Sequence, residues 1–261
     1  MAKLQIPSHN VVEALCKINS PKSNGLEYSD KIWVKYGTTV TLTEATIQQY
    51  VHEHADPLIV RVPEVFDAFT ITQPNGASMT YIIMMENVKG DDYATCSKRH
   101  QQVAAQALER IANAVRHIWD MPLSANATIG PLGQQRPVDR FFSDCESDRF
   151  FNDAIELEDW INAKLEEGGY PDRIVLQGER LSICHCDLTQ FNIKMSEPIA
   201  IIDWGFAGIY HRAFEEFALV HQFNLKGQKF AKALHRQLFG PKLSKHMRAL
   251  ALAARFHAFG C

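Results

Sequence analysis

The stretch His185-Cys-Asp187-Leu-Thr-Gln-Phe-Asn192, followed by Ile201-Ile-Asp203-Trp-Gly205, says most about the fold of this chain. It places an Asp five residues before an Asn, and a second Asp eleven residues further on. The run Ala200-Ile201-Ile202 before that second Asp is apolar and rich in β-branched residues, as in a buried strand. The pattern predicts that a polar loop and a strand end bring three oxygen-bearing side chains to one cleft.

Oxygen-bearing side chains with this spacing suit the transfer of a phosphoryl group. Such a reaction asks the protein mainly to position the nucleophile and to neutralise the phosphate oxygens with Mg²⁺. In this interpretation Asp187 accepts the proton of the attacking hydroxyl, Asn192 offers a neutral oxygen to the metal, and Asp203 is the charged metal ligand. We include His185 in the candidate catalytic group and expect it to hold the loop rather than to perform chemistry. The alternative is ordinary loop polarity, because Asp and Asn favour turns.

A lysine upstream fits the same chemistry. The segment Ile32-Trp-Val-Lys35-Tyr36 alternates as a half-buried strand, which places Lys35 on the opposite face from the apolar residues. A lysine in such a strand can bind nucleotide phosphates if an acid fixes its position. We expect Glu44, at the start of a helix that runs to His54, to be that acid, with Glu53 as the second choice. In the competing interpretation, Glu44 and Thr41 form a capping box.

Taken together, these segments resemble the kinase-like small-molecule phosphotransferases of the aminoglycoside phosphotransferase and choline kinase group, particularly its shorter, largely fungal members. The resemblance covers nearly the whole chain. The segments that carry it are Val34-Lys-Tyr-Gly37, Glu44-Ala45, Tyr81-Ile-Ile-Met-Met-Glu86-Asn-Val-Lys-Gly90, Gly130-Pro-Leu-Gly133, His185 to Asn192, and Ile201-Ile-Asp-Trp204.

The resemblance implies an α+β, bilobal, protein kinase-like fold. A small N-terminal sheet lobe would occupy residues 1–88 and a mainly helical C-terminal lobe residues 89–261. It also implies ATP and Mg²⁺ as cofactors and a hydroxyl-bearing small molecule as acceptor. The family's roles would fall on Lys35, Glu44, Asp187, Asn192 and Asp203. The backbone at Glu86 and Val88 would contact the adenine.

The sequence also differs from protein kinases and from the phosphotransferases that it resembles. The protein-kinase loop Gly-x-Gly-x-x-Gly is absent before the lysine strand, and no Ala-Pro-Glu segment follows Asp203. Gly205 stands where many relatives carry an acid. Two alternatives therefore stay open: a protein-directed or otherwise specialised kinase, and a kinase-fold protein that binds a nucleotide or metabolite without transferring phosphate.

The composition of the chain indicates which broad class of protein it belongs to. The 261 residues are 46% hydrophobic and 22% charged, as in an ordinary globular protein, and the net charge of −3 gives no reason to expect nucleic acid. No apolar window is long enough to predict a membrane span, and the chain start lacks a secretory core. The six dispersed cysteines favour reduced thiols and a cytosolic protein. Cys184-His-Cys186 lacks the partner pair that a zinc site needs.

Local patterns predict further elements. Residues 65–71 and 80–84 flank Gln73-Pro-Asn-Gly76 and predict a β-hairpin. An apolar stripe of period three to four predicts a long helix over 97–119. A short helix capped by Asn10 is expected to bury its stripe of apolar residues, namely Val11, Val12, Leu15 and Ile18.

Residues 139–172 are strongly acidic, with eleven Asp or Glu residues against three Arg or Lys, and aromatic residues punctuate them. In the related enzymes the corresponding insert borders the acceptor site. An acidic, aromatic rim would suit an amine-bearing acceptor. The alternative is an amphipathic helix whose acids face water while its aromatic side chains pack inward.

Overall fold

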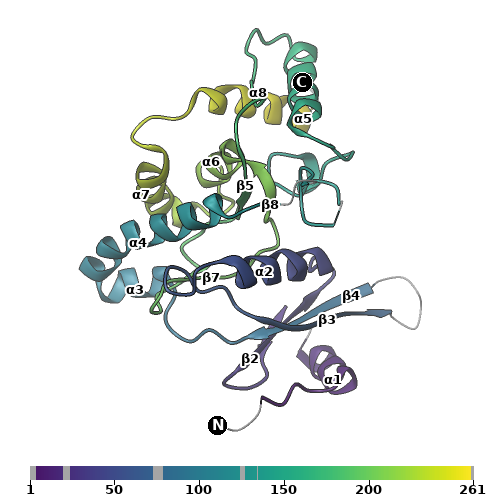
Figure 1. Cartoon of the computed structure of the whole chain (residues 1–261), viewed down its shortest axis with the longest axis vertical. Coiled ribbons are helices and arrows are strands. Elements are labelled where there is room, and N and C mark those ends of the chain that lie inside the picture. Colours follow the sequence, from purple (N-terminus) through teal and green to yellow (C-terminus); the bar gives the residue numbers. More distant parts are fainter. Residues whose placement is uncertain (1–3, 20–23, 73–78, 124–126, 134, 260–261) are drawn as a thin grey trace.

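The first lobe is built on a four-stranded antiparallel sheet (Figure 1). The computed structural model describes residues 4–19, 24–72, 79–123, 127–133 and 135–259. The strands are β1 (Gly25–Glu27), β2 (Ile32–Gly37), β3 (Val65–Thr72) and β4 (Met79–Glu86), in the order β1-β2-β4-β3. The antiparallel pairing of β3 with β4 confirms the predicted hairpin, whose turn lies outside the described residues.

Strand β2 has the predicted alternation. Its three apolar residues Ile32, Val34 and Tyr36 are buried, and they pack with Ile82 and Met84 of β4 against the helix α1 (His9–Asn19). Because successive side chains of a strand point to opposite faces, Lys35 faces away from this cluster.

The predicted buried stripe of α1 is wrong in most of its members. Val12 is buried as expected, but its partner on the inner face is Cys16, one helical turn further on. Val11, Leu15 and Ile18 are exposed. Val12 and Cys16 pack on the sheet in one cluster, so within the described residues a narrow face of the helix is buried.

Helix α2 (Leu42–His54) lies between the sheet and the second lobe (Figure 1). Ala45 packs with Ile83 and Met85 of β4, whereas Ile47 and Val51 belong to the large core of the second lobe. The helix begins two residues before Glu44 because Thr41 caps it, accepting a hydrogen bond from the Glu44 N–H. Helix α2 therefore links the packing of the two lobes.

The second lobe is mainly helical. The predicted long helix over 97–119 is interrupted at His100, whose backbone is not helical, so two helices form there. The helices of the lobe are α3 (Tyr93–Arg99), α4 (Gln101–Asp120), η1 (Ser143–Cys145), α5 (Ala154–Glu167), α6 (Arg212–Val220), η2 (Leu225–Gly227), α7 (Gln228–Phe239) and α8 (Lys245–Phe259). No described helix combines the length and the apolar character that a membrane span requires.

Two short antiparallel pairs of strands lie between α5 and α6 in the chain. Strand β5 (Leu181–Cys184) pairs with β8 (Gly208–His211), and β6 (Ile193–Lys194) pairs with β7 (Ala200–Ile201). Arg61 of the first lobe joins β7 through backbone hydrogen bonds to Ile199 and Ile201. The arrangement is the two-lobed α+β organisation expected from the sequence. The boundary of the lobes at Val88 stays a prediction.

Candidate active site

The loop between β5 and β6 brings Asp187 and Asn192 together. The Nδ2 atom of Asn192 donates to Oδ2 of Asp187 at 2.8 Å and to the Asp187 carbonyl at 2.9 Å. The backbone N–H of Asn192 closes a turn on the carbonyl of Thr189 at 3.1 Å. Since its amide nitrogen faces Asp187, the side-chain oxygen of Asn192 points away from that carboxylate.

His185 holds this loop from inside. Its ring is buried, and its Nδ1 accepts a hydrogen bond from the N–H of Asp187 at 3.2 Å. Its Nε2 lies 3.1 Å from the carbonyl oxygen of Ile202, to which it donates. Burial lowers the pKa of His185, although the nearby Asp187 and Asp203 oppose this. Both nitrogens of the neutral ring are thus engaged with the backbone, as a loop-holding role requires.

Lys35, Glu44 and Asp203 form a charged network from three separate segments, namely β2, α2 and the loop after β7. The Nζ atom of Lys35 lies 2.5 Å from Oε1 of Glu44 and 2.7 Å from Oδ1 of Asp203. The Glu44 side chain is 1% exposed and that of Asp203 46% exposed. The pairing of Lys35 with Glu44 is therefore formed, and Thr41 caps the same helix independently. Glu53 instead bonds Gln49 on its own helix.

The pKa values in this network follow from burial and charge. Burial of Lys35 favours its neutral form, but Glu44 and Asp203 outweigh that effect and raise its pKa. Burial also disfavours the charged form of Asp203, yet Lys35 lowers the pKa of this carboxyl below its ordinary value. Lys35 therefore stays protonated and Asp203 ionised near neutral pH.

The backbone places Asp203 beside the Asp187 loop. Ile202, its neighbour in sequence, donates from its N–H to the Asn192 carbonyl at 3.0 Å. Asp203 itself has a φ of 67°, in the left-handed region that Asp tolerates better than most residues. This turn directs its carboxylate to Lys35 as β7 ends.

Glu86 and Val88 lie where β4 leads into the second lobe. Glu86 is ion-paired with Arg61, and its N–H donates to the Glu64 carbonyl at 2.8 Å. Val88 is buried. Their contact with an adenine ring stays a prediction.

Arg140 is one of two residues at the candidate site that the sequence did not reveal. Its Nη2 lies 2.5 Å from Oδ1 of Asp187 and 3.0 Å from the Cys186 carbonyl, and its side chain is 2% exposed. The guanidinium also lies over the rings of Phe206 and Phe223, at 5.6 and 4.6 Å from their centroids. With Asn192 on the other oxygen, both carboxylate oxygens of Asp187 are held.

A buried acid supports the backbone of the same loop. Glu215 of α6 accepts hydrogen bonds from the N–H groups of His185 and Cys186, at 2.6 and 3.0 Å. Burial raises the pKa of Glu215 to about 7, although these two bonds oppose the shift. Cys186 has a φ of 55°, so the two bonds also fix a strained residue. Nothing in the sequence ties Glu215 to a loop thirty residues earlier.

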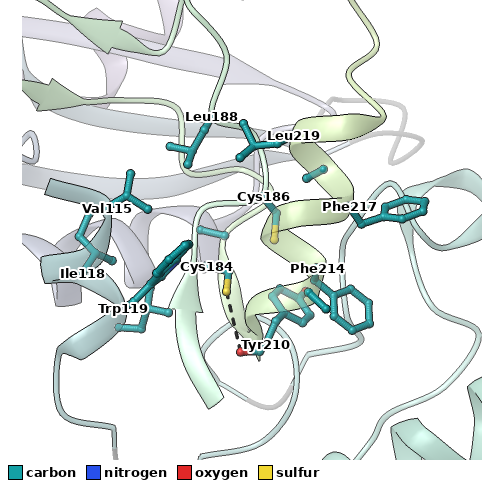
Figure 2. Close-up of a cluster of buried hydrophobic side chains, with 14 of the residues drawn as sticks. Val115, Ile118, Trp119, Cys184, Cys186, Leu188, Tyr210, Phe214, Phe217 and Leu219 are labelled. Atoms are coloured by element: carbon teal, nitrogen blue, oxygen red, sulfur yellow. Dashed lines mark hydrogen bonds between the residues drawn. The ribbon is translucent and has the colours of Figure 1, made fainter. Parts of the chain in front are cut away.

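Cys184 and Cys186 belong to the core behind this loop (Figure 2). They lie among Trp119, Tyr210 and Phe214, and both thiols are free. Burial raises the pKa of both thiols, so both are protonated in this environment.

The acidic stretch divides into two parts. Its first residues lie at the site, where Asp139 is buried and Arg140 reaches Asp187. Its helix α5 packs against α8, at the end of the second lobe remote from the sheet (Figure 1). Most of its aromatic side chains are buried in the core, namely Phe141, Phe142, Phe151 and Trp160. The packing agrees with the alternative of an amphipathic helix.

The chain matches known proteins at the level of a family and a fold. The family model described as "Phosphotransferase enzyme family" matches residues 40–251. Among the curated proteins no match was found.

Solved structures with a similar fold include aminoglycoside phosphotransferase APH(4)-Ia, with a TM-score of 0.56 and 13% identity over 94% of this chain and 88% of that one. Spectinomycin phosphotransferase APH(9)-Ia, in complex with ADP and spectinomycin, has a TM-score of 0.51 and 11% identity over 95% and 87%. The GDP complex of aminoglycoside 2'-phosphotransferase-IIIa has a TM-score of 0.51 and 12% identity over 95% and 88%.

Proposed function

This chain belongs to the phosphotransferase enzyme family, and from that premise we propose that it transfers the γ-phosphate of ATP to a hydroxyl group of a small molecule. The observation that carries the proposal is that two hydrogen-bonded networks, one around Lys35 and one around Asp187, lie in one region. Lys35 is held by Glu44 and Asp203, and Asp187 is held by Asn192 and Arg140. A nucleotide-binding network and a fixed carboxylate are the two parts that phosphoryl transfer needs.

In the proposed reaction Asp187 orients the acceptor hydroxyl and takes its proton. The hydroxyl oxygen forms a bond to the γ-phosphorus while the bond from that phosphorus to the bridging oxygen of the leaving ADP breaks. Asp187 suits this role because its carboxylate is fixed by Asn192 and Arg140, which leaves lone pairs on its oxygens for one more donor. Lys35 would bind the phosphates of the nucleotide.

The residues present fit a magnesium ion. Asp203 offers a partly exposed, ionised carboxylate, and Asn192 offers a side-chain oxygen turned away from Asp187. Oxygen donors of this kind are the ligands that Mg²⁺ prefers. When bound, the ion would neutralise negative charge on the phosphates.

The acceptor in this proposal is a hydroxyl-bearing small molecule. One structural neighbour, a thermostable mutant of APH(4)-Ia, was crystallised with ADP and hygromycin B, and another with ADP and spectinomycin. The inward packing of the aromatic residues in the acidic stretch removes one reason to require an amine on the acceptor. The free cysteines among the described residues, four of the five buried, are consistent with the proposed cytosolic setting.

The proposal is tested by a screen for product. The full chain is incubated with Mg²⁺ and either ATP or GTP, together with amino sugars, amino alcohols and uncharged polyols. Nucleotide consumption is measured, and each acceptor is examined by mass spectrometry for one added phosphate. We expect at least one hydroxylated acceptor to gain a phosphate. Nucleotide binding without any phosphorylated acceptor would favour the binding-protein alternative.

A further inference from the structure

A second cluster of polar side chains lies away from the proposed active site. Glu179, His211 and His246 each direct one potential ligand atom to a common point, and these atoms all lie within 4.8 Å of one another. Nε2 of His211 is 2.5 Å from one carboxylate oxygen of Glu179, and Nε2 of His246 is 3.3 Å from the other. Among the described residues this is the group of His, Cys, Asp and Glu side chains that converges in this way.

The three residues come from distant parts of the second lobe. Glu179 lies in the connection before β5, His211 is the last residue of β8, and His246 lies in the first turn of α8. Both histidine side chains are nearly buried, while the Glu179 side chain is 35% exposed. The cluster lines a surface cavity of about 670 Å³, so one side of it is open to solvent.

The chemistry of the donors indicates the class of ion. Two imidazole nitrogens and one carboxylate suit zinc and similar transition-metal ions, and catalytic zinc sites use this set with water as a further ligand. Mg²⁺ and Ca²⁺ prefer oxygen ligands. None of the three residues takes part in the network around Lys35 or Asp187.

We propose that Glu179, His211 and His246 form a binding site for a zinc-class divalent cation, which would fasten the start of α8 to the end of β8. Strand β8 is already paired with β5, whereas the start of α8 is tied to this region by the Lys245–Glu179 ion pair and by the Ser244 N–H, which donates to Glu216. A bound ion would add three coordinate bonds between segments that are far apart in sequence.

Two changes accompany binding in this proposal. Lys245, which lies 2.9 Å from Glu179, must move away, and its side chain is 72% exposed and able to do so. His211 must free its Nε2. Its Nδ1 now accepts a hydrogen bond from the Ala213 N–H at 3.1 Å, so the proton of the neutral ring is on Nε2. The ion takes Nε2, the proton moves to Nδ1, and the cap of α6 at Ala213 is lost.

The competing interpretation is a hydrogen-bonded cluster in which Lys245 already balances the charge of Glu179. The two interpretations predict different results when Lys245 is replaced. If the cluster binds a metal, Lys245→Gln removes a competing cation and tightens binding. If the cluster is held by Lys245, the same change only weakens its packing.

The test is a titration of the full chain, free of any histidine tag, with ZnCl₂ and separately with CoCl₂. We expect one zinc ion per chain by calorimetry, a rise in melting temperature with Zn²⁺ but not with Mg²⁺, and a visible absorption band with Co²⁺. His246→Gln and Glu179→Gln should each weaken binding by about tenfold or more, since loss of even supporting groups typically does so. Lys245→Gln should strengthen it.

A matched control is His235→Gln. His235 forms a buried pair with Glu216 at 2.9 Å, and no second histidine of the described residues joins that pair to make a converging group. This variant should bind zinc like the wild type. Circular dichroism of each variant without metal shows whether it folds. Absence of stoichiometric zinc binding to the wild type would overturn the proposal, and so would binding unchanged in folded His246→Gln and Glu179→Gln.

Discussion

At the scale of single residues, the proposed chemistry depends most on the contact between Arg140 and Asp187. The guanidinium holds one carboxylate oxygen and the Asn192 amide holds the other. Rotation of the carboxylate would break both bonds, so its orientation is fixed before any acceptor arrives. The Arg140 side chain is nearly buried, and Asp187 is its ion-pair partner.

Asp187→Asn should separate chemistry from nucleotide binding. ATP affinity is expected to stay close to wild type, whereas turnover should fall about 100-fold or more through loss of the general base. The variant should also lose about 1 to 3 kcal/mol of unfolding free energy, because the buried Arg140 loses the carboxylate with which it is ion-paired. Calorimetric ATP titration, steady-state kinetics and urea unfolding measure the three effects. Turnover equal to wild type would remove Asp187 from the proposed role.

Arg140→Lys tests the orientation of the base. Lysine keeps the charge but lacks the planar fork that contacts Asp187 and the Cys186 carbonyl together. We expect kcat to fall about tenfold while KM for ATP stays unchanged. The control is Arg110→Lys, because Arg110 pairs with Glu197 on the surface, away from the site. Equal kinetics for both variants would show that Arg140 only supports the fold.

At the scale of elements, the start of α2 has two separable tasks. Thr41 caps the helix through Glu44 N–H, and the Glu44 side chain binds Lys35. Thr41→Ala should therefore cost about 1 kcal/mol of stability and leave KM for ATP unchanged. Glu44→Gln should raise that KM by about tenfold, since it removes a charged partner of Lys35. The kinetics and thermal unfolding of both variants decide this. A Glu44→Gln variant with normal KM and a lowered melting temperature would contradict the division.

Elements with a strong local pattern were predictable from the sequence. Strand β2 showed period two, and the pairing of β3 with β4 followed from two apolar runs around turn residues. Helix α1 was not, because several faces of a short helix carry apolar residues and only the contact with the sheet selects Val12 and Cys16. The break at His100 likewise leaves no strong signal, since neither Gly nor Pro marks it.

Only part of the candidate site was predictable. Spacing within one stretch of sequence is visible in the sequence, whereas contacts between distant segments are not. Asp187, Asn192 and Asp203 lie in one short stretch, so their spacing could be read directly. Arg140 is 47 residues from Asp187, and Glu215 is 30 residues from His185. Their contacts depend on how separate elements pack, and Arg140 is one of three bases in an acidic run of sequence, where nothing singles it out.

At the scale of the whole molecule, the two lobes meet through α2 and through the backbone of Arg61. Lys35 comes from the first lobe and Asp203 from the second, so their ion pair spans the junction. The candidate site also depends on the stability of the second lobe, because buried Glu215 accepts hydrogen bonds from the backbone of the loop that carries Asp187.

Glu215 should make stability depend on pH. Burial raises its pKa from 4.5 to about 7, so between these values the folded state keeps a proton that the unfolded state has lost. Its contribution is present below about pH 4.5 and is lost as pH rises through about 7. Urea unfolding of wild type and Glu215→Gln at several pH values tests this. The stability of the wild type relative to the variant should decrease across this window, and parallel profiles would contradict the assignment.

The central claim is that this chain moves phosphate from a nucleotide to a hydroxyl group with Asp187 as the base. It is tested most directly by following labelled γ-phosphate from ATP into an acceptor in a single turnover, for wild type and for Asp187→Asn. We predict labelled acceptor with the wild type, and transfer about 100-fold slower with the variant at saturating nucleotide. Transfer at the same rate by both proteins, or nucleotide binding by the wild type without label in any hydroxylated compound, would contradict the claim.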